Sequence, residues 1–145
     1  MICYLDTSAL VKLYVREEGA DVVRELVMRC SAAGTSKVAY AEARAAFARA
    51  LRQGVIGDEG YREIVAALHN DWHTYLAMEV SDALIFLAGD LSERHGLRGF
   101  DAIHLASALT LKTQVSEEMV AACFDSRLWE AFRVYLPVMP QTEPV

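Results

Sequence analysis

Two short apolar segments, each followed by an aspartate, constrain the fold of this chain more than any other feature. Residues 2–5 (ICYL) precede Asp6, and residues 119–124 (MVAACF) precede Asp125. Apolar runs of this length are typical of strands that are buried on both faces of a sheet. The segments between them carry apolar residues at helical spacing, and no Asn-Gly hairpin turn occurs. Parallel strands need helical crossovers, so the sequence predicts an α/β fold with a mostly parallel sheet.

The other elements are predicted from apolar spacing and from residues that begin or end helices. We expect helices at residues 7–14, between Gly19 and Gly34, at 40–53, at 58–75, between Ser81 and Gly96, at 101–112 and at 127–132. We expect additional short strands at residues 35–38, 76–80 and 134–136. With the two apolar segments above, the predicted sheet has about five strands.

The length of 145 residues indicates one domain. We place this domain at residues 1–136. The last nine residues, 137–145, contain all three prolines and are expected to form a tail that leaves the fold. No apolar segment approaches the roughly 18–20 residues that cross a membrane, so no membrane association is expected.

The cysteines and the first residues indicate a cytoplasmic protein. Three cysteines are an odd number and include no Cys-x-x-Cys pair, which disfavours a disulfide framework and favours a reducing compartment. No basic segment precedes Asp6, so a signal peptide is not expected.

Four carboxylates fall at predicted junctions between strands and helices. Asp6 and Asp125 follow the two apolar segments. Glu42 lies in the first turn of an expected helix, and Asp101 begins another one after a glycine and a phenylalanine. Ligand sites in open α/β sheets form beyond the carboxyl ends of the strands. We therefore expect all four carboxylates within reach of one pocket.

Each of these carboxylates also has a purely structural explanation that stays open. Asp6 and Asp101 are suitable helix N-caps, and Asp125 is a suitable turn residue. Glu42 places negative charge near the beginning of a helix, where it is favourable. These roles do not exclude a shared site, because a carboxylate can cap a helix and also face a pocket.

A cluster of carboxylates has a clear chemical use. Like charges at close range raise one another's pKa values, and a divalent cation removes this repulsion. Mg²⁺ and Mn²⁺ prefer carboxylate and water oxygens as ligands. Such an ion lowers the pKa of a bound water and neutralises the charge of a phosphodiester.

Four segments resemble the motifs of PIN-domain proteins, and most of all those of the VapC-type toxins of bacterial and archaeal toxin–antitoxin systems. The segments, in family order, are YLDTSALVKLY at 4–14, VAYAE at 38–42, GFDAIHLA at 99–106 and CFDSRL at 123–128. The resemblance spans residues 2–136. It implies a three-layer sandwich in which a parallel sheet of about five strands is flanked by helices.

The resemblance further implies an Mg²⁺- or Mn²⁺-dependent endoribonuclease that hydrolyses RNA phosphodiester bonds. Such a toxin is held inactive by a cognate antitoxin protein and commonly forms a homodimer. The catalytic and metal-binding pocket would consist of Asp6, Glu42, Asp101 and Asp125, with Ser8 hydrogen-bonded inside it. Cys123 stands where the family commonly has Thr, and a thiol is a weaker donor than a hydroxyl. Asp125 is accordingly the weakest candidate for direct binding of the metal, and Asp6 and Asp101 are the strongest candidates.

Two further residues are assigned supporting roles. His104 lies three residues after Asp101 on roughly the same helix face, where it can orient a carboxylate or a water, although a structural role is favoured. Arg49 is two turns from Glu42 and is expected near the pocket mouth, where it can contact phosphate. Further candidates for this rim are Arg44, Arg52, Arg94, Arg98 and Arg127. The apolar stripe of the helix at 58–75 is compatible with a homodimer.

The net charge of −6 disfavours a protein that binds nucleic acid without selectivity, because such proteins carry a basic surface. Two bound divalent ions would reduce this charge from −6 to about −2. The remaining imbalance confines the expected RNA contact to a patch.

Two alternatives remain. An aspartyl phosphotransfer domain also places an Asp after a strand, but Ser8 stands where a phosphatase has its second Asp, and the last lysine, Lys112, lies in a helix. A non-catalytic PIN-like module that binds RNA or protein is the other. Four retained carboxylates speak against it, because their cluster is unfavourable without a metal.

Overall fold

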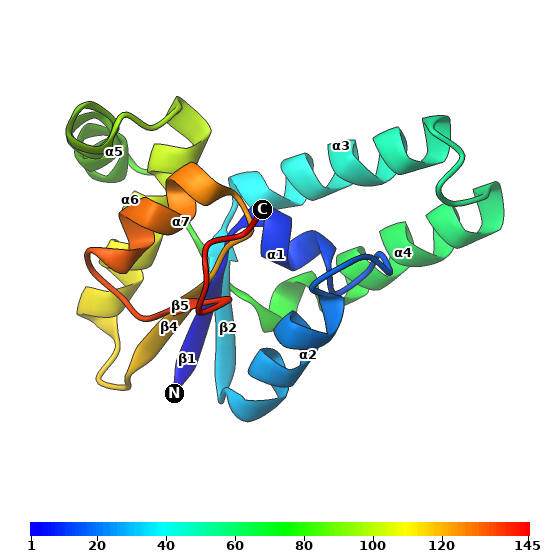
Figure 1. Ribbon diagram of the computed structural model, residues 1–145, viewed down its shortest axis with the longest axis horizontal. Coiled ribbons are helices and arrows are strands. Elements are labelled where there is room, and N and C mark those ends of the chain that lie inside the picture. Colours follow the sequence, from blue (N-terminus) through cyan, green and yellow to red (C-terminus); the bar gives the residue numbers. More distant parts are fainter.

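Five parallel strands form a single sheet in the computed structural model, which describes all 145 residues (Figure 1). The strands are β1 (Ile2–Leu5), β2 (Ala32–Ser36), β3 (Leu76–Met78), β4 (Met119–Ala122) and β5 (Val138–Met139). Their order is β3-β2-β1-β4-β5, and every neighbouring pair is parallel. The predicted α/β fold with a sheet of about five parallel strands is confirmed.

Helices cover both faces of this sheet. They are α1 (Thr7–Val11), α2 (Ala20–Arg29), α3 (Val38–Arg52), α4 (Asp58–Asp71), α5 (Asp82–His95), α6 (Gly99–Gln114) and α7 (Ser126–Arg133), with a 3₁₀ turn at Trp72–Thr74. Figure 1 shows α1 to α4 on one side of the sheet and α5 to α7 on the other. The result is the expected three-layer sandwich. None of the helices is long and apolar enough to cross a membrane.

The central strand β1 contributes to two hydrophobic cores at once. Ile2 and Tyr4 belong to the cluster formed with α5, α6 and α7, and Cys3 and Leu5 belong to the cluster formed with α1 to α4. Successive side chains of a strand point to opposite faces, so a strand covered on both sides must be apolar throughout. This explains why the run ICYL shows no alternation.

The apolar stripe of α4 packs within the chain. Leu68 is fully buried, and Tyr61, Ile64, Val65 and Trp72 pack against the same core cluster, which includes Phe47 of α3. In Figure 1 the two helices form an antiparallel pair that extends away from the sheet. Because the stripe has an intrachain partner, it adds no support to the homodimer prediction.

Strand β2 lies earlier in the chain than the predicted strand at 35–38. Helix α2 ends at Arg29, and Gly34, which was expected to end a helix, lies inside β2. A Cβ atom at position 34 would collide with the side chain of Leu111 in α6. Glycine inside a strand often marks such a close approach, and here it lets α6 pack directly on the sheet.

Helix α1 is also shorter than predicted. It ends at Val11, after which the chain continues in tight turns in which, for example, the amide of Leu13 donates to the carbonyl of Leu10. These i→i+3 bonds keep the apolar spacing close to helical, so the pattern at residues 7–14 resembled one continuous helix.

The predicted strand at 134–136 is wrong, and the first residues of the expected tail belong to the sheet. Edge strand β5 pairs with β4: the amide of Ala121 donates to the carbonyl of Pro137 (2.9 Å) and that of Cys123 to the carbonyl of Met139 (3.0 Å). The indole of Trp129 donates to the carbonyl of Pro140 (2.8 Å). Proline carbonyls can accept these bonds on a sheet edge, where no amide donor is needed.

Truncation of the chain after Leu136 tests this packing. The truncated protein loses three hydrogen bonds and the cover of β4, so its free energy of unfolding should fall by about 2–4 kcal/mol. Urea denaturation measures this change. Truncation after Gln141 is the matched control and should leave the stability near that of the full chain. Equal stability of the two truncated proteins would show that β5 contributes nothing.

Candidate active site

A cleft of about 730 Å³ lies where the carboxyl ends of the central strands meet the beginnings of several helices. The four predicted carboxylates Asp6, Glu42, Asp101 and Asp125 all line it. Ser8, His104 and Arg49 line the same cleft. The structure therefore brings these seven residues together, and their roles in catalysis and metal binding stay predictions. Of the further rim candidates only Arg98 lines the cleft, whereas Arg44, Arg52, Arg94 and Arg127 do not.

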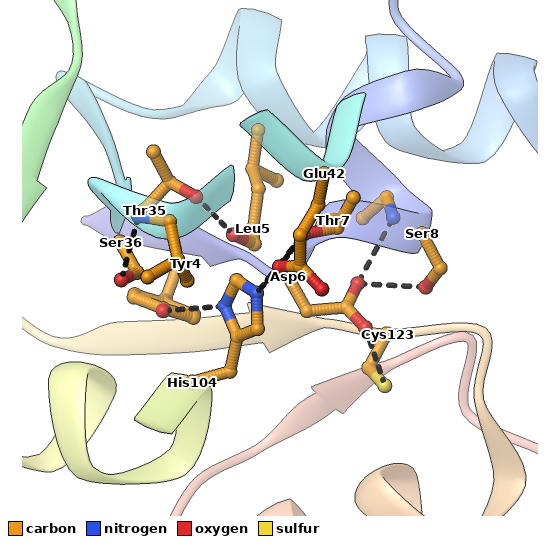
Figure 2. A network of polar contacts seen from close by, with 12 residues as sticks. Tyr4, Leu5, Asp6, Thr7, Ser8, Thr35, Ser36, Glu42, His104 and Cys123 are labelled. Carbon is orange, nitrogen blue, oxygen red and sulfur yellow. Dashed lines mark hydrogen bonds and ion pairs between the residues drawn. The ribbon is translucent and has the colours of Figure 1, made fainter. Parts of the chain in front are cut away.

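Asp6 combines the two roles that the sequence left open, because it caps a helix and faces the cleft. Its Oδ1 accepts hydrogen bonds from the amide of Ala9 (2.9 Å) and the hydroxyl of Ser8 (2.7 Å) (Figure 2). Its Oδ2 accepts one from the thiol of Cys123 (3.2 Å). Burial raises the pKa of Asp6, against the opposing effects of nearby His104 and of these hydrogen bonds.

Ser8 and Cys123 connect Asp6 to the end of β4. The Ser8 hydroxyl, besides donating to Asp6, accepts the amide of Phe124 (2.8 Å). The sequence predicted that the thiol of Cys123 would be a weaker hydrogen-bond donor near Asp125 than the hydroxyl that is common in the family. It instead contacts the carboxylate of Asp6 and only the main-chain carbonyl of Asp125 (3.4 Å). The substitution of thiol for hydroxyl therefore bears first on Asp6. Burial raises the pKa of Cys123, so it remains a neutral thiol.

Glu42 is held by two donors on its Oε1. The hydroxyl of Thr7 donates to it (2.6 Å), and Nε2 of His104 lies 2.9 Å away. Burial works against ionisation of Glu42, but the hydrogen bonds from His104 and Thr7 outweigh it and lower its pKa. Glu42 thus stays a carboxylate.

His104 links the cleft to the interior of the protein. Its side chain is buried, with Nδ1 2.8 Å from the hydroxyl of Tyr4 and Nε2 within 3.0 Å of Thr7 (Figure 2). All contacts are satisfied when Nε2 carries a proton towards Glu42 and Tyr4 donates to Nδ1. The sequence pointed to His104 but missed Tyr4 and Thr7. A tyrosine inside an otherwise apolar strand was the available signal, because a buried hydroxyl needs a partner.

Asp101 and Asp125 lie at the beginnings of two helices and repel each other. Asp101 is in the first turn of α6, and Asp125 caps α7 through the amide of Leu128 (3.0 Å). Burial and the charge of Asp125 raise the pKa of Asp101, while Arg98 lowers it. Arg98 approaches both carboxylates, at 3.6 Å from Asp101 and 3.8 Å from Asp125.

The donor set fits a hydrated hard cation and does not form a complete protein cage. No three acidic, histidine or cysteine side chains lie close enough together to hold a metal ion by themselves. All four carboxylates in the cleft offer oxygen ligands, and burial together with the charge of Asp125 raises the pKa of Asp101, a cost that a bound cation would relieve. Mg²⁺ keeps several waters and often uses only one or two protein carboxylates.

The rim and wall of the cleft differ from its acidic floor. Lys12, Arg49 and Arg98 contribute positive charge, and the wall beside α3 consists of small apolar residues such as Ala46 and Ala50. The ammonium of Lys12 lies 4.5 Å from the centre of the Phe124 ring and pairs with Glu17. The lining of the cleft therefore combines cations with carboxylates, and Glu17 is one of these carboxylates.

Comparison with known proteins identifies the class. A family model described as PIN domain matches residues 3–131. The chain is 35% identical over 127 residues to a protein named ribonuclease VapC45 from Mycobacterium tuberculosis, which covers 88% of this chain and 86% of the relative. The chain therefore belongs to the PIN-domain family.

Two solved structures share the fold at low sequence identity. A toxin–antitoxin complex from Klebsiella pneumoniae contains a chain with a TM-score of 0.66 and 15% identity, covering 97% of this chain and 98% of that chain. The structure of VapBC2 from Rickettsia felis, bound to a DNA fragment from its promoter, gives a TM-score of 0.62 and 15% identity, with coverage of 95% and 97%. These likenesses confirm the architecture.

The Asp6→Asn variant tests the electrostatic cost of the buried carboxylate. Burial raises the folded-state pKa of Asp6, so its stabilising contribution is present below the unfolded pKa of about 3.9 and is lost as the pH rises through the folded value. Without added metal, Asp6→Asn should therefore be more stable than the wild type at neutral pH and lose this advantage in acid. Thermal unfolding across pH measures the difference.

The control for this comparison is Asp21→Asn, because the side chain of Asp21 is 97% exposed. It should show no gain that depends on pH. If Asp6→Asn were less stable than the wild type at neutral pH, its hydrogen bonds would outweigh the cost of burying its charge.

The Tyr4→Phe variant tests the interior end of the His104 network. The substitution leaves the buried Nδ1 of His104 without its donor, which should lower the free energy of unfolding by about 1–3 kcal/mol. Tyr135→Phe is a matched control, since Tyr135 makes a similar bond to His95 (2.7 Å) in a less buried place. Urea denaturation should show the larger loss for Tyr4→Phe, and a smaller loss would argue against this network.

Proposed function

We propose that this protein is a metal-dependent endoribonuclease that hydrolyses RNA phosphodiester bonds as the toxin of a toxin–antitoxin pair. The observation that carries the proposal is the gathering of four carboxylates in one cleft of a PIN-domain chain. The name of the relative at 35% identity, a ribonuclease, supports the same activity. The catalytic and metal-binding residues are Asp6, Glu42, Asp101 and Asp125.

The carboxylates have different parts in this proposal. Asp6 and Asp101 are the proposed direct ligands of the metal, with Asp125 and Glu42 completing the acidic floor. When bound, Mg²⁺ or Mn²⁺ supplies a water of lowered pKa and neutralises charge on the phosphate. Glu42 stays ionised, and its Oε2 makes no hydrogen bond within the protein. This oxygen is therefore free to accept a hydrogen bond from the attacking water.

The hydrogen bonds around the floor keep the carboxylates in place. Ser8 fixes Asp6, and His104 with Thr7 fixes Glu42. Groups that are positioned before substrate binds need no reorganisation during the reaction, which is a main source of catalytic power. Ser8 and His104 are accordingly positioning residues.

The charge distribution supports selective contact with RNA at the rim of the cleft. The chain carries a net charge of −6, which opposes binding of a polyanion over the whole surface. Lys12, Arg49 and Arg98 line the cleft and are the groups proposed to contact phosphates.

A cognate antitoxin is the proposed protein partner. The solved structures that share the fold include toxin–antitoxin complexes, which supports such a partner through likeness of fold. We place the protein in the cytoplasm, in keeping with its three free cysteines.

A homodimer is also part of the proposal. Helix α5 exposes Ile85 and Phe86, which are candidates for the contact between the two copies. Light scattering of the purified chain tests whether it forms a dimer.

An aspartyl phosphotransfer activity has little support. Ser8 stands where a phosphatase has its second Asp, and its hydroxyl donates to Asp6 and accepts the amide of Phe124. The last lysine, Lys112, donates to the carbonyl of Tyr135 and does not line the cleft. The non-catalytic module is distinguished from the nuclease by the experiment that follows.

The proposed activity is tested by incubating a mixed pool of structured RNA with the purified chain in Mn²⁺, in Mg²⁺ and in EDTA. We expect fragments with either metal and none in EDTA. Asp101→Asn should reduce cleavage by about a hundredfold or more, the scale for removal of a group that stabilises developing charge.

Asp90→Asn is the control, since Asp90 is an exposed residue of α5 outside the cleft. It should cleave like the wild type. Cleavage by Asp101→Asn at the wild-type rate would refute the assignment of the site. A folded wild-type chain that binds Mn²⁺ but cleaves no RNA would favour the non-catalytic module.

A further inference from the structure

Arg98 lies across the two carboxylates that begin α6 and α7. Its Nε is 3.6 Å from Oδ2 of Asp101, and its Nη2 is 3.8 Å from Oδ2 of Asp125. The side chain of Arg98 is 82% exposed, whereas those of Asp101 and Asp125 are 20% and 36% exposed. One exposed cation thus balances two carboxylates that are less exposed.

The position of Arg98 explains why it can do this. It is the residue that immediately precedes α6, and its main chain is extended there, so its side chain starts beside the first turn that carries Asp101. The carboxylate of Asp125 is held at the beginning of α7 by its hydrogen bond to Leu128. Asp101 and Asp125 repel each other, and Arg98 is the cation that offsets this repulsion.

The two ion pairs of Arg98 are weak enough for another cation to replace Arg98 at the carboxylates. Both ion pairs are longer than a hydrogen bond, and the Arg98 side chain that makes them is mostly exposed to water, so each of them is weak. A divalent cation next to Asp101 would be repelled by the guanidinium. Displacing Arg98 costs little, and the released side chain remains on the rim of the cleft.

We propose that Arg98 is a built-in counter-ion of Asp101 and Asp125, which a divalent cation displaces and which then binds a phosphate of the RNA. This inference rests on the proposed function. A guanidinium offers a planar fork of donors that matches the oxygens of a phosphate as well as those of a carboxylate. The divalent cation and Arg98 therefore compete for the same two carboxylates, and Arg98 links metal binding to substrate binding.

The first test is a calorimetric titration of the purified chain with Mn²⁺ alone. Arg98→Gln removes the competing charge, so it should bind Mn²⁺ about two- to tenfold more tightly than the wild type, on the scale of the two exposed ion pairs that are lost. Arg98→Lys keeps the charge and should bind like the wild type. Arg94→Gln removes an exposed arginine outside the cleft and is the matched control. Unchanged or weaker Mn²⁺ binding by Arg98→Gln would overturn the counter-ion role.

The second test measures binding of a short, fluorescently labelled single-stranded RNA by anisotropy at saturating Mn²⁺. It uses the Glu42→Gln background to prevent cleavage, because this change keeps Asp6 and Asp101 as metal ligands and Glu42 makes no contact with Arg98. Adding Arg98→Gln should weaken RNA binding several-fold and reduce the salt dependence by about one phosphate contact, a slope change of about 0.7. Adding Arg94→Gln should change neither. Equal RNA affinity with and without Arg98→Gln would overturn the phosphate contact.

Failure of this inference is distinguishable from failure of the proposed function. If the wild type cleaves RNA but Arg98→Gln binds Mn²⁺ no more tightly, the nuclease stands and the counter-ion role falls. If the wild type cleaves nothing and Arg98→Gln still binds Mn²⁺ more tightly, the counter-ion role stands and the nuclease falls.

Discussion

The hydrogen bonds to the buried carboxylate of Asp6 are the interactions on which the rest of the structure depends. Asp6 ends the central strand, begins α1 and receives the thiol of Cys123 from the end of β4. Asp6 accepts hydrogen bonds from three donors, which are the hydroxyl of Ser8, the amide of Ala9 and the thiol of Cys123. These bonds connect the ends of β1 and β4 at the edge of the sheet where the cleft lies. The hydrogen bonds compensate only part of the cost of burial, because the pKa of Asp6 is still raised. The fold therefore buries a carboxylate whose ionisation is unfavourable, at a place where a bound cation would stabilise its negative charge.

The other carboxylates are balanced by different means. Glu42 receives hydrogen bonds from Thr7 and His104, which lower its pKa and keep it ionised. Asp101 and Asp125 share the charge of a mostly exposed arginine. In the floor of the cleft, Glu42 is thus held by two hydrogen bonds, whereas Asp101 and Asp125 share one weak ionic partner. This division gives each carboxylate a separate place in the proposed chemistry.

Much of the architecture was predictable because local signals agreed with the tertiary structure. Ser81 caps α5 and Gly96 ends it in the left-handed conformation, as the sequence indicated. Strand β1 was recognisable because both of its faces are covered. The gathering of the carboxylates followed from the rule that parallel strands end on the same edge of a sheet.

What the sequence did not reveal depended on contacts between distant segments. The prolines around β5 suggested a tail, because nothing local shows that β4 needs an edge partner. Arg98 resembled any surface arginine until the beginnings of α6 and α7 were placed side by side. Tyr4 and Thr7 gained their roles from His104, which lies about a hundred residues further along the chain. Gly34 has a similar long-range dependence, because a Cβ atom there would collide with the side chain of Leu111. Leu111 belongs to α6, the helix that also carries Asp101 and His104 into the cleft. The absence of a single side chain inside the sheet thus lets the helix that supplies two residues of the cleft lie directly on β2.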